Sequence, residues 1–273
     1  MSVISTVNLL QRARESGRPL VLAHRGGRHL YPENTLEAFS RCFSDGAEGV
    51  ELDVRCTRDG KVVVFHDAEL ETLTDGQGRA SHKSWEEIRT IRVRNHQGDL
   101  TDQTIPRFEE VLEALPVDGF LNVEIKFERG SYPGNSSLPL VRRTLEVLRG
   151  ESAFGERPVI ISSFSMQVNL QLRALARDFA RGYLFEQRWG VPRYRRIGDR
   201  LLAAHALHPA KELVSDELMA AARRAGREVA VWTVNEPDDM RRLARMGVGA
   251  LITDRPDIGR EVVDSLGQGG GRA

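Results

Sequence analysis

A regular alternation of short apolar runs with helical patterns is the strongest constraint on the fold. Eight runs have the composition of buried strands, and a helical pattern follows each of them, in one case after a longer polar segment. Continuous apolar runs are typical of parallel strands that are covered on both faces. Eight strand–helix units favour an α/β fold of the closed (β/α)8 type, a TIM barrel, over an open doubly wound sheet. The runs are PLVLAH (19–24), GVELDV (49–54), LNVEIK (121–126), PVIISS (158–163), GYLFE (182–186), ALHPA (206–210), EVAVWTV (228–234) and ALITD (250–254).

The chain length agrees with one domain of this kind. A chain of 273 residues suits a single barrel of about 250 residues as well as two ordinary domains. The polar segment after the second strand interrupts the alternation, and only residues 84–91 within it have a helical pattern. We therefore predict one domain over residues 1–273, with a small insertion at about 68–104 and a flexible glycine-rich tail at about 267–273.

Charge and targeting signals exclude several classes of partner. The 39 basic and 39 acidic residues give a net charge of +0, so we expect neither nucleic acid nor a membrane surface as partner. No apolar run approaches the roughly 18 residues of a spanning helix, and the N-terminal residues do not resemble a signal peptide. Cys42 and Cys56 have no metal-binding spacing and suit buried thiols. We expect a cytoplasmic protein with a small-molecule substrate and leave the oligomeric state open.

The stretch ELDVRCTRDGKVVVFHD (51–67) places charged residues inside an otherwise apolar segment. It has the pattern of a strand, a tight Asp-Gly turn and a second strand. Glu51 and Asp53 are two residues apart on an extended segment, so their side chains share one face of the sheet. The turn brings His66 back toward them. Buried charges are costly unless they are paired or bind a ligand, so this stretch indicates a functional site.

Carboxylates from two adjacent strands form a candidate metal site. Active sites of such barrels lie at the C-terminal ends of the strands, where Glu51, Asp53 and Glu124 would meet. Three oxygen ligands without cysteine fit a hard divalent cation, Mg²⁺ or Ca²⁺, with positions left for water or substrate. A single carboxylate is explained as readily by an ion pair with Lys126 or an arginine, but the three together favour a metal.

Two histidines and two cations complete the candidate site. Near neutral pH, His24 and His66 can accept and donate a proton, as cleavage of a phosphodiester requires, although a lone histidine in a barrel is more often structural. Arg25 and Lys126 suit the oxygens of a phosphate and, equally, charge balance for the carboxylates. Trp232 could form an apolar wall for the substrate, but simple packing within the barrel is slightly favoured. Polar residues at strand ends to which we assign no role include Ser162, Ser163, Asn235, Thr253 and Asp254.

Seven segments resemble the glycerophosphodiester phosphodiesterase family, in the order of that family and from about residue 20 to 258. The resemblance implies a TIM barrel with an insertion after the second strand and a reaction that releases an alcohol and sn-glycerol 3-phosphate from a glycerophosphodiester. It also implies a divalent cation on Glu51, Asp53 and Glu124, His24 and His66 as acid and base, and Arg25 and Lys126 on the phosphate. The segments are HRG (24–26), PENT (32–35), ELDVRCTRDGKVVVFHD (51–67), IPRFEEVL (105–112), VEIK (123–126), VWTVNEP (231–237) and ITDRPD (252–257).

Two departures from the family pattern concern specificity rather than the catalytic set. LETLTDGQG (70–78) replaces a threonine-rich run, and Arg107 and Phe108 replace a small polar residue and leucine. Two alternative functions stay open: a lysophospholipase D-type activity on lysophospholipids, and a non-catalytic barrel that binds phosphorylated ligands. The sequence also leaves open the cation, the roles of the two histidines, a cyclic intermediate and the alcohol. We expect the insertion to overhang the barrel mouth and help select that alcohol.

Overall fold

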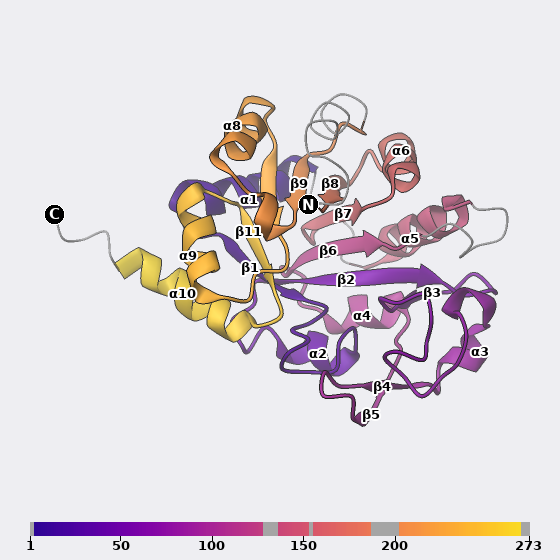
Figure 1. Cartoon of the computed structure of the whole chain (residues 1–273). Helices are drawn as coiled ribbons and strands as arrows, with labels where there is room; N and C mark the ends of the chain where they lie inside the picture. The colour runs from indigo at the N-terminus through magenta and orange to yellow at the C-terminus, as the bar shows by residue number, and fades with distance from the viewer. Residues whose placement is uncertain (1–2, 128–135, 153–154, 187–201, 269–273) are drawn as a thin grey trace.

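The chain folds into a closed barrel of parallel strands surrounded by helices (Figure 1). The computed structural model describes residues 3–127, 136–152, 155–186 and 202–268. Its main sheet has nine strands, and β1 also pairs with β2, so the eight parallel strands close once the antiparallel β3 is set aside. This confirms the predicted TIM barrel. The barrel strands are β1 (Leu20–His24), β2 (Gly49–Cys56), β6 (Phe120–Ile125), β7 (Val159–Ser163), β8 (Ala180–Phe185), β9 (Ala206–Pro209), β10 (Glu228–Val231) and β11 (Ala250–Thr253).

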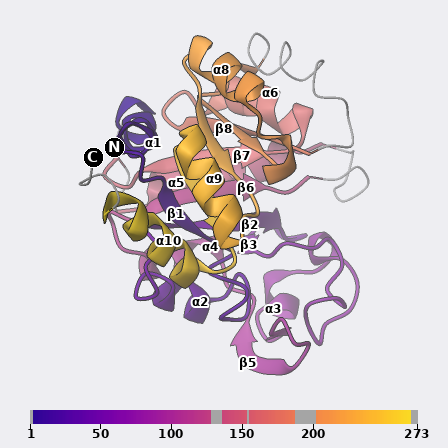
Figure 2. The same cartoon turned by 60° about the vertical axis from the view of Figure 1, so that its left-hand side comes forward.

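Helices follow the strands along the chain and cover the outside of the barrel (Figures 1 and 2). The side chains of Thr35 and Ser215 accept hydrogen bonds from Ala38 N and Leu218 N, which caps the first turns of two helices. The helices beside the barrel are α1 (Val3–Ser16), α2 (Leu36–Arg41), α4 (Phe108–Ala114), α5 (Leu138–Gly150), α6 (Met166–Leu175), α8 (Asp216–Arg224), α9 (Pro237–Met246) and α10 (Pro256–Gln268). None of the helices in the described ranges is long and apolar enough to cross a membrane.

Two predicted segments differ from the structure or fall outside it. Helix α10 continues to Gln268, so the first two residues of the predicted tail at 267–273 are helical. The remainder of that tail lies outside the described residues. The helical pattern expected after GYLFE (182–186) falls largely on residues 187–201, which also lie outside them.

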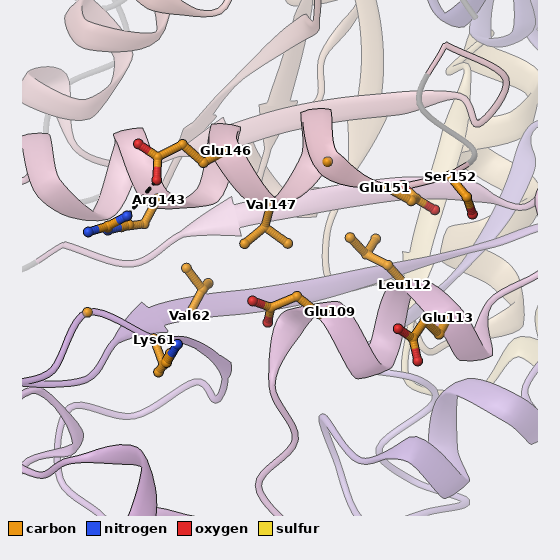
Figure 3. A pocket seen from close by; sticks show the side chains of 12 residues that line it. Lys61, Val62, Glu109, Leu112, Glu113, Arg143, Glu146, Val147, Glu151 and Ser152 are labelled. Atoms are coloured by element: carbon orange, nitrogen blue, oxygen red, sulfur yellow. Dashed lines mark hydrogen bonds and ion pairs between the residues drawn. The ribbon is translucent and has the colours of Figure 1, made fainter.

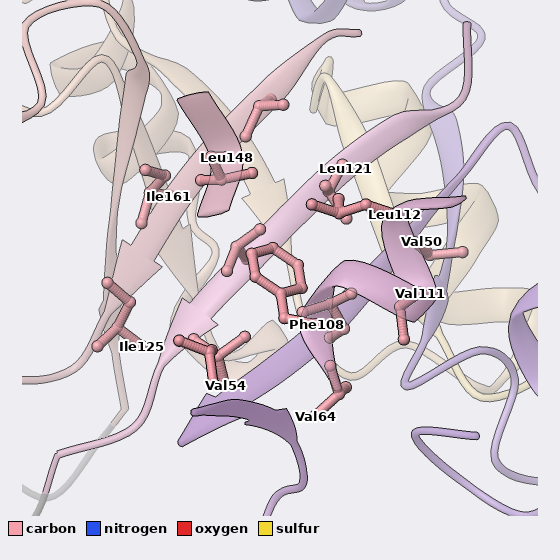
Figure 4. Close-up of a cluster of buried hydrophobic side chains, with 14 of the residues drawn as sticks. Val50, Val54, Val64, Phe108, Val111, Leu112, Leu121, Ile125, Leu148 and Ile161 are labelled. Carbon is pink, nitrogen blue, oxygen red and sulfur yellow. The ribbon is translucent and has the colours of Figure 1, made fainter. Parts of the chain in front are cut away.

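Apolar side chains close one end of the barrel and cover its wall. Leu10 of α1 is 1% exposed and packs in the cluster of Leu22, Ile160 and Ile252, which lie on three barrel strands. Outside the barrel, Phe108 of α4 is fully buried in the apolar cluster that includes Val54 of β2 and Ile125 of β6 (Figure 4). The family departure at Phe108 therefore concerns packing.

The insertion has a small core of its own beside the barrel (Figure 2). Strand β3 (Val62–Val64) runs antiparallel to the end of β2, which confirms the strand–turn–strand prediction. The insertion then forms a 3-10 turn η1 (Ala80–His82), a short helix α3 (Trp85–Ile88) and a hairpin of β4 (Arg92–Arg94) with β5 (Leu100–Thr104). The sequence did not predict this hairpin because β5, LTDQT, is mostly polar. The rings of His96 and His29 stack at 4.6 Å, which joins the insertion to the loop after β1.

Both cysteines are buried free thiols, as predicted. Burial raises the pKa of Cys42 to about 12 and that of Cys56 to about 11. Both side chains therefore remain neutral, which agrees with their place in the apolar cluster between β2 and the helices.

A buried histidine on β9 has an unusual environment. His208 is fully buried, and neither ring nitrogen has a hydrogen-bond partner among the residues that the structure describes. Burial lowers its pKa to about 3. Gly182 on β8 leaves room for the ring, since a Cβ there would lie 2.7 Å from His208 Nε2. The barrel therefore holds this imidazole in its neutral form.

We expect His208 to make the fold sensitive to acid. Its folded-state pKa lies below the unfolded value, so below about pH 6.5 only the unfolded chain takes up the proton and stability decreases down to about pH 3. Between pH 7 and pH 5 this residue alone removes about 2 kcal/mol from the free energy of unfolding. Urea unfolding at pH 7 and pH 5 measures the free energy of unfolding of wild type and of His208→Leu. The decrease from pH 7 to pH 5 should be smaller in His208→Leu by about 2 kcal/mol. An identical loss in both proteins would contradict the assignment.

Candidate active site

The candidate site lies beside β2, at the point where β2 changes its pairing partner from β1 to β3. Strand β1 pairs with β2 up to Glu51, and β3 pairs with it from Val54 onward. Between these pairings, Arg25 N donates to Glu51 O at 2.9 Å and Phe65 N donates to Asp53 O at 2.9 Å. The two carboxylate residues of β2 therefore occupy the point at which one neighbouring strand replaces the other.

Glu51, Asp53 and Glu124 form a compact and buried carboxylate cluster. Each offers an oxygen, and these oxygens lie within 4.8 Å of one another. Asp53 on β2 is in register with Glu124 on β6, which places the two side chains on the same face of neighbouring strands. The structure thus brings together the three residues that the sequence predicted as metal ligands.

The pKa values of Glu51 and Asp53 are shifted in opposite directions. Burial, together with repulsion from Asp53 and Glu124, raises the pKa of Glu51 well above its usual value. Burial also opposes ionisation of Asp53, but Lys126 and Arg25 hold its pKa below the usual range. Without a further cation, Asp53 is ionised and Glu51 tends to keep its proton. A divalent cation beside these oxygen donors would favour the ionised form of Glu51.

Both predicted phosphate-binding cations pair with carboxylates. Arg25 Nη1 donates to Glu33 Oε1 at 2.7 Å, and its Nε lies 3.3 Å from Asp53 Oδ2. Lys126 Nζ lies 2.7 Å from Glu124 Oε1 and 3.3 Å from Asp53 Oδ1. Charge balance, which the sequence left open for both residues, is therefore one of their roles. Their positive charge also lies beside the carboxylate cluster, where a bound phosphate would need it.

His24 is oriented by a carboxylate from the last barrel strand. Its Nδ1 lies 2.6 Å from Asp254 Oδ1, and its Nε2 lies 3.9 Å from Glu51 Oε2. Burial opposes ionisation of Asp254, but the hydrogen bond from His24 lowers its pKa, so Asp254 accepts and Nδ1 donates. Burial, and next Arg25, lower the pKa of His24 itself. The imidazole therefore turns its Nε2 toward the carboxylate cluster.

His66 has a similar partner in a more open position. Its Nδ1 lies 2.5 Å from Asp67 Oδ1, and its side chain is 27% exposed. The hydrogen bond from His66 lowers the pKa of Asp67, which makes Asp67 an orienting acceptor. Arg55 donates to the carbonyl oxygen of His66 through Nε at 2.9 Å and Nη2 at 2.6 Å. This contact fixes the backbone at the end of the β2–β3 hairpin.

The structure adds residues to which the sequence assigned no role. Asn34, at φ 58°, donates from Nδ2 to Asp53 Oδ2 at 2.9 Å. Asn235 donates from Nδ2 to Asp254 Oδ2 at 2.8 Å and accepts from Asp254 N at 2.9 Å. The PENT segment and the strand-end positions pointed to these residues, but neither signal identified their partners.

Trp232 lies beside the site and has a hydrogen bond of its own. Its Nε1 donates to His208 O at 2.9 Å, and its ring meets that of Phe164 edge-on at 5.2 Å. Both residues line a cavity of about 410 Å³ that also reaches His66. A larger cavity of about 580 Å³ lies over α4 and α5 and is lined by Lys61, Glu109 and Arg143, among others (Figure 3). It contains none of the predicted site residues.

Known proteins of one family are similar to this chain in sequence and in fold. The model of the Glycerophosphoryl diester phosphodiesterase family matches residues 24–258. A glycerophosphodiester phosphodiesterase of Caldanaerobacter subterraneus is 34% identical over 242 residues, which cover 88% of this chain and 96% of the relative.

Solved structures show the same similarity. A putative glycerophosphoryl diester phosphodiesterase from Silicibacter pomeroyi has a TM-score of 0.80 at 26% identity, over 93% of this chain and 97% of that one. An Oleispira antarctica phosphodiesterase, solved in complex with the product sn-glycerol-3-phosphate, has a TM-score of 0.76 at 25% identity, over 92% and 99%. These matches confirm the resemblance and the predicted enzyme class. The chain belongs to the glycerophosphoryl diester phosphodiesterase family.

Proposed function

We propose that this chain hydrolyses glycerophosphodiesters to an alcohol and sn-glycerol 3-phosphate in a reaction that depends on a divalent cation and on two histidines. The observation that carries the proposal is the cluster of Glu51, Asp53 and Glu124, whose ligand oxygens lie within 4.8 Å of one another. Histidines from β1 and from the end of the β2–β3 hairpin flank this cluster. The relative solved with sn-glycerol-3-phosphate supports the assignment of the product.

The three carboxylates would hold Mg²⁺ or Ca²⁺, since both prefer oxygen ligands. When bound, the cation supplies Lewis acidity and offsets negative charge at the phosphate. Its charge would also offset the burial and the repulsion from Asp53 and Glu124 that raise the pKa of Glu51. These residues therefore bind and orient, and they do not transfer protons.

His24 and His66 carry the protons in this mechanism. Each has its Nδ1 bound to an aspartate, which leaves Nε2 as the atom that can exchange a proton with the substrate. One imidazole accepts the proton of the attacking hydroxyl, and the other donates a proton to the departing alcohol oxygen. Arg25 and Lys126 orient the phosphate and stabilise the charge that develops on its oxygens.

The direct test measures release of sn-glycerol 3-phosphate from glycerophosphocholine with purified protein. We expect turnover that stops with a chelator and returns when Mg²⁺ or Ca²⁺ is added, which also identifies the cation. The same assay with lysophosphatidylcholine as substrate tests the alternative lysophospholipase D-type activity. Metal and ligand binding without turnover on a broad panel of glycerophosphodiesters would contradict the proposal and favour a non-catalytic barrel.

Asp254 is proposed as a positioning residue. In Asp254→Asn only one acceptor oxygen remains for two donors, Asn235 Nδ2 and His24 Nδ1; when Asn235 holds that oxygen, the amide NH2 faces Nδ1 and the favoured tautomer of His24 changes. We expect kcat to fall about 10- to 100-fold with a smaller change in KM, together with a shifted pH profile of kcat. Asp257→Asn, which removes a carboxylate paired with Arg255, is the matched control. An unchanged pH profile in Asp254→Asn would contradict a positioning role.

A further inference from the structure

The cavity beside His66 has walls of a distinctive chemistry. It has a volume of about 410 Å³, and its lining includes Phe164, Leu184, Trp232 and the carboxylate of Glu186. Among the described residues, no lysine or arginine lines it, and neither does any residue of the insertion at 68–104. Aromatic faces and one carboxylate attract a positive charge, and the cation that lies over the Phe164 ring, Lys126, is itself paired with Glu124 and Asp53.

Two aromatic rings form a corner of this cavity. The rings of Phe164 and Trp232 are perpendicular, at 90°, with centroids 5.2 Å apart. The indole nitrogen of Trp232 already donates to His208 O, so a ligand meets the apolar ring and not its polar atom. Phe164 is 39% exposed, which is unusual for a large apolar side chain and leaves part of its ring open to a ligand.

The position of the cavity identifies which part of the substrate enters it. Lys126 Nζ lies 5.9 Å from the centre of the Phe164 ring and also contacts the carboxylate cluster. A phosphate beside Lys126 therefore lies close to Phe164. In the proposed function the carboxylates and their cation would hold the glycerol side of the diester, and the alcohol on the other side of the phosphate would then extend past His66 into the cavity.

We propose that this cavity is the binding site for the leaving alcohol and that it selects an alcohol carrying a quaternary ammonium group, such as choline. The inference rests on the proposed phosphodiesterase function. Phe164 and Trp232 supply the aromatic faces, and Glu186, which also lines the cavity, supplies the opposite charge. This assigns selection of the alcohol to the residues that directly follow β7, β8 and β10, namely Phe164, Glu186 and Trp232, in place of the insertion suggested by the sequence.

The test compares glycerophosphocholine with its neutral isostere, in which 3,3-dimethylbutanol replaces choline. The two alcohols have the same shape, so the ratio of their kcat/KM values isolates the contribution of the charge. We expect wild type to favour glycerophosphocholine roughly 5- to 30-fold. In Phe164→Leu and in Glu186→Gln this ratio should fall toward one. Glu212→Gln, which removes an exposed glutamate of η5 (Lys211–Leu213), should keep the ratio of wild type.

The outcomes separate this inference from the proposed function. Turnover of both substrates at equal kcat/KM, or a ratio that neither variant changes, would overturn the assignment of the cavity and leave the phosphodiesterase function intact. Absence of turnover on both substrates with Mg²⁺ and with Ca²⁺ would contradict the function itself. In that case calorimetric titration with choline tests whether the cavity binds the alcohol. Binding to wild type that is weaker in Phe164→Leu would support this assignment, and the absence of binding would overturn it.

Discussion

Replacement of His24 or of His66 by alanine is expected to lower kcat on glycerophosphocholine by about 10²- to 10⁴-fold. Each side chain has its Nδ1 bound to an aspartate, which leaves Nε2 as the atom that can exchange a proton with the substrate. Loss of either imidazole removes one of the two proton transfers that hydrolysis needs. Initial rates of sn-glycerol 3-phosphate release at saturating substrate and cation measure the effect.

The double variant distinguishes joint action from independent contributions. If the two imidazoles act in one reaction, the loss in His24→Ala/His66→Ala should be much smaller than the product of the single losses. His82→Ala, in the insertion, is the matched control and should retain the kcat of wild type. A kcat within a few-fold of wild type in either single variant would remove that histidine from the mechanism.

Replacement of Glu51 by glutamine should separate activity from stability. The cluster loses one charged ligand, so we expect activity to fall by about 10²- to 10³-fold, even at high cation concentration. The metal-free protein should nevertheless become more stable at neutral pH. The folded-state pKa of Glu51 lies above its unfolded value, so its stabilising contribution is complete below about pH 4.5 and is lost as the pH rises. Glutamine avoids this loss.

Thermal unfolding in chelator between pH 5 and pH 8 measures this effect. The Tm of wild type should decrease relative to that of Glu51→Gln as the pH rises. Asp53→Asn is the contrasting variant, because Asp53 is ionised and pairs with Arg25 and Lys126. Removing that charge takes one carboxylate partner from each of two buried cations, which keep only Glu33 and Glu124, and should lower the stability. Equal stability changes in both variants would contradict the charge distribution in the cluster.

The barrel and most of the site were predictable from sequence because each has a local signal. Buried parallel strands are apolar on both faces, and the polar residues that end them all fall at one end of the barrel. Glu51, Asp53 and Glu124 were therefore identified as a set, and the structure places their oxygens within 4.8 Å. The β2–β3 hairpin was predicted for the same reason, since its turn and both strands are contiguous.

The partners of these residues were not predictable because they depend on contacts between distant segments. Asp254 lies 230 residues from His24, and no local pattern connects them. Asn34 reaches Asp53 only because its backbone is left-handed in the folded loop. The polar β4–β5 hairpin of the insertion lacks the alternation that marks a strand. The cavity beside His66 likewise combines side chains from the ends of separate strands.

The contact between His24 and Asp254 connects the first barrel strand with the residue that follows the last one, so it cannot form until residue 254 has been synthesised. His24 belongs to the first strand and Asp254 directly follows the last, so β1 finds this partner only after nearly the whole chain has emerged from the ribosome. The carboxylate residues of β2 and β6 leave the ribosome much earlier. Until β11 joins β1, however, His24 has no aspartate to fix its tautomer, so enzymatic competence appears with the closing of the ring rather than with the assembly of its ligands.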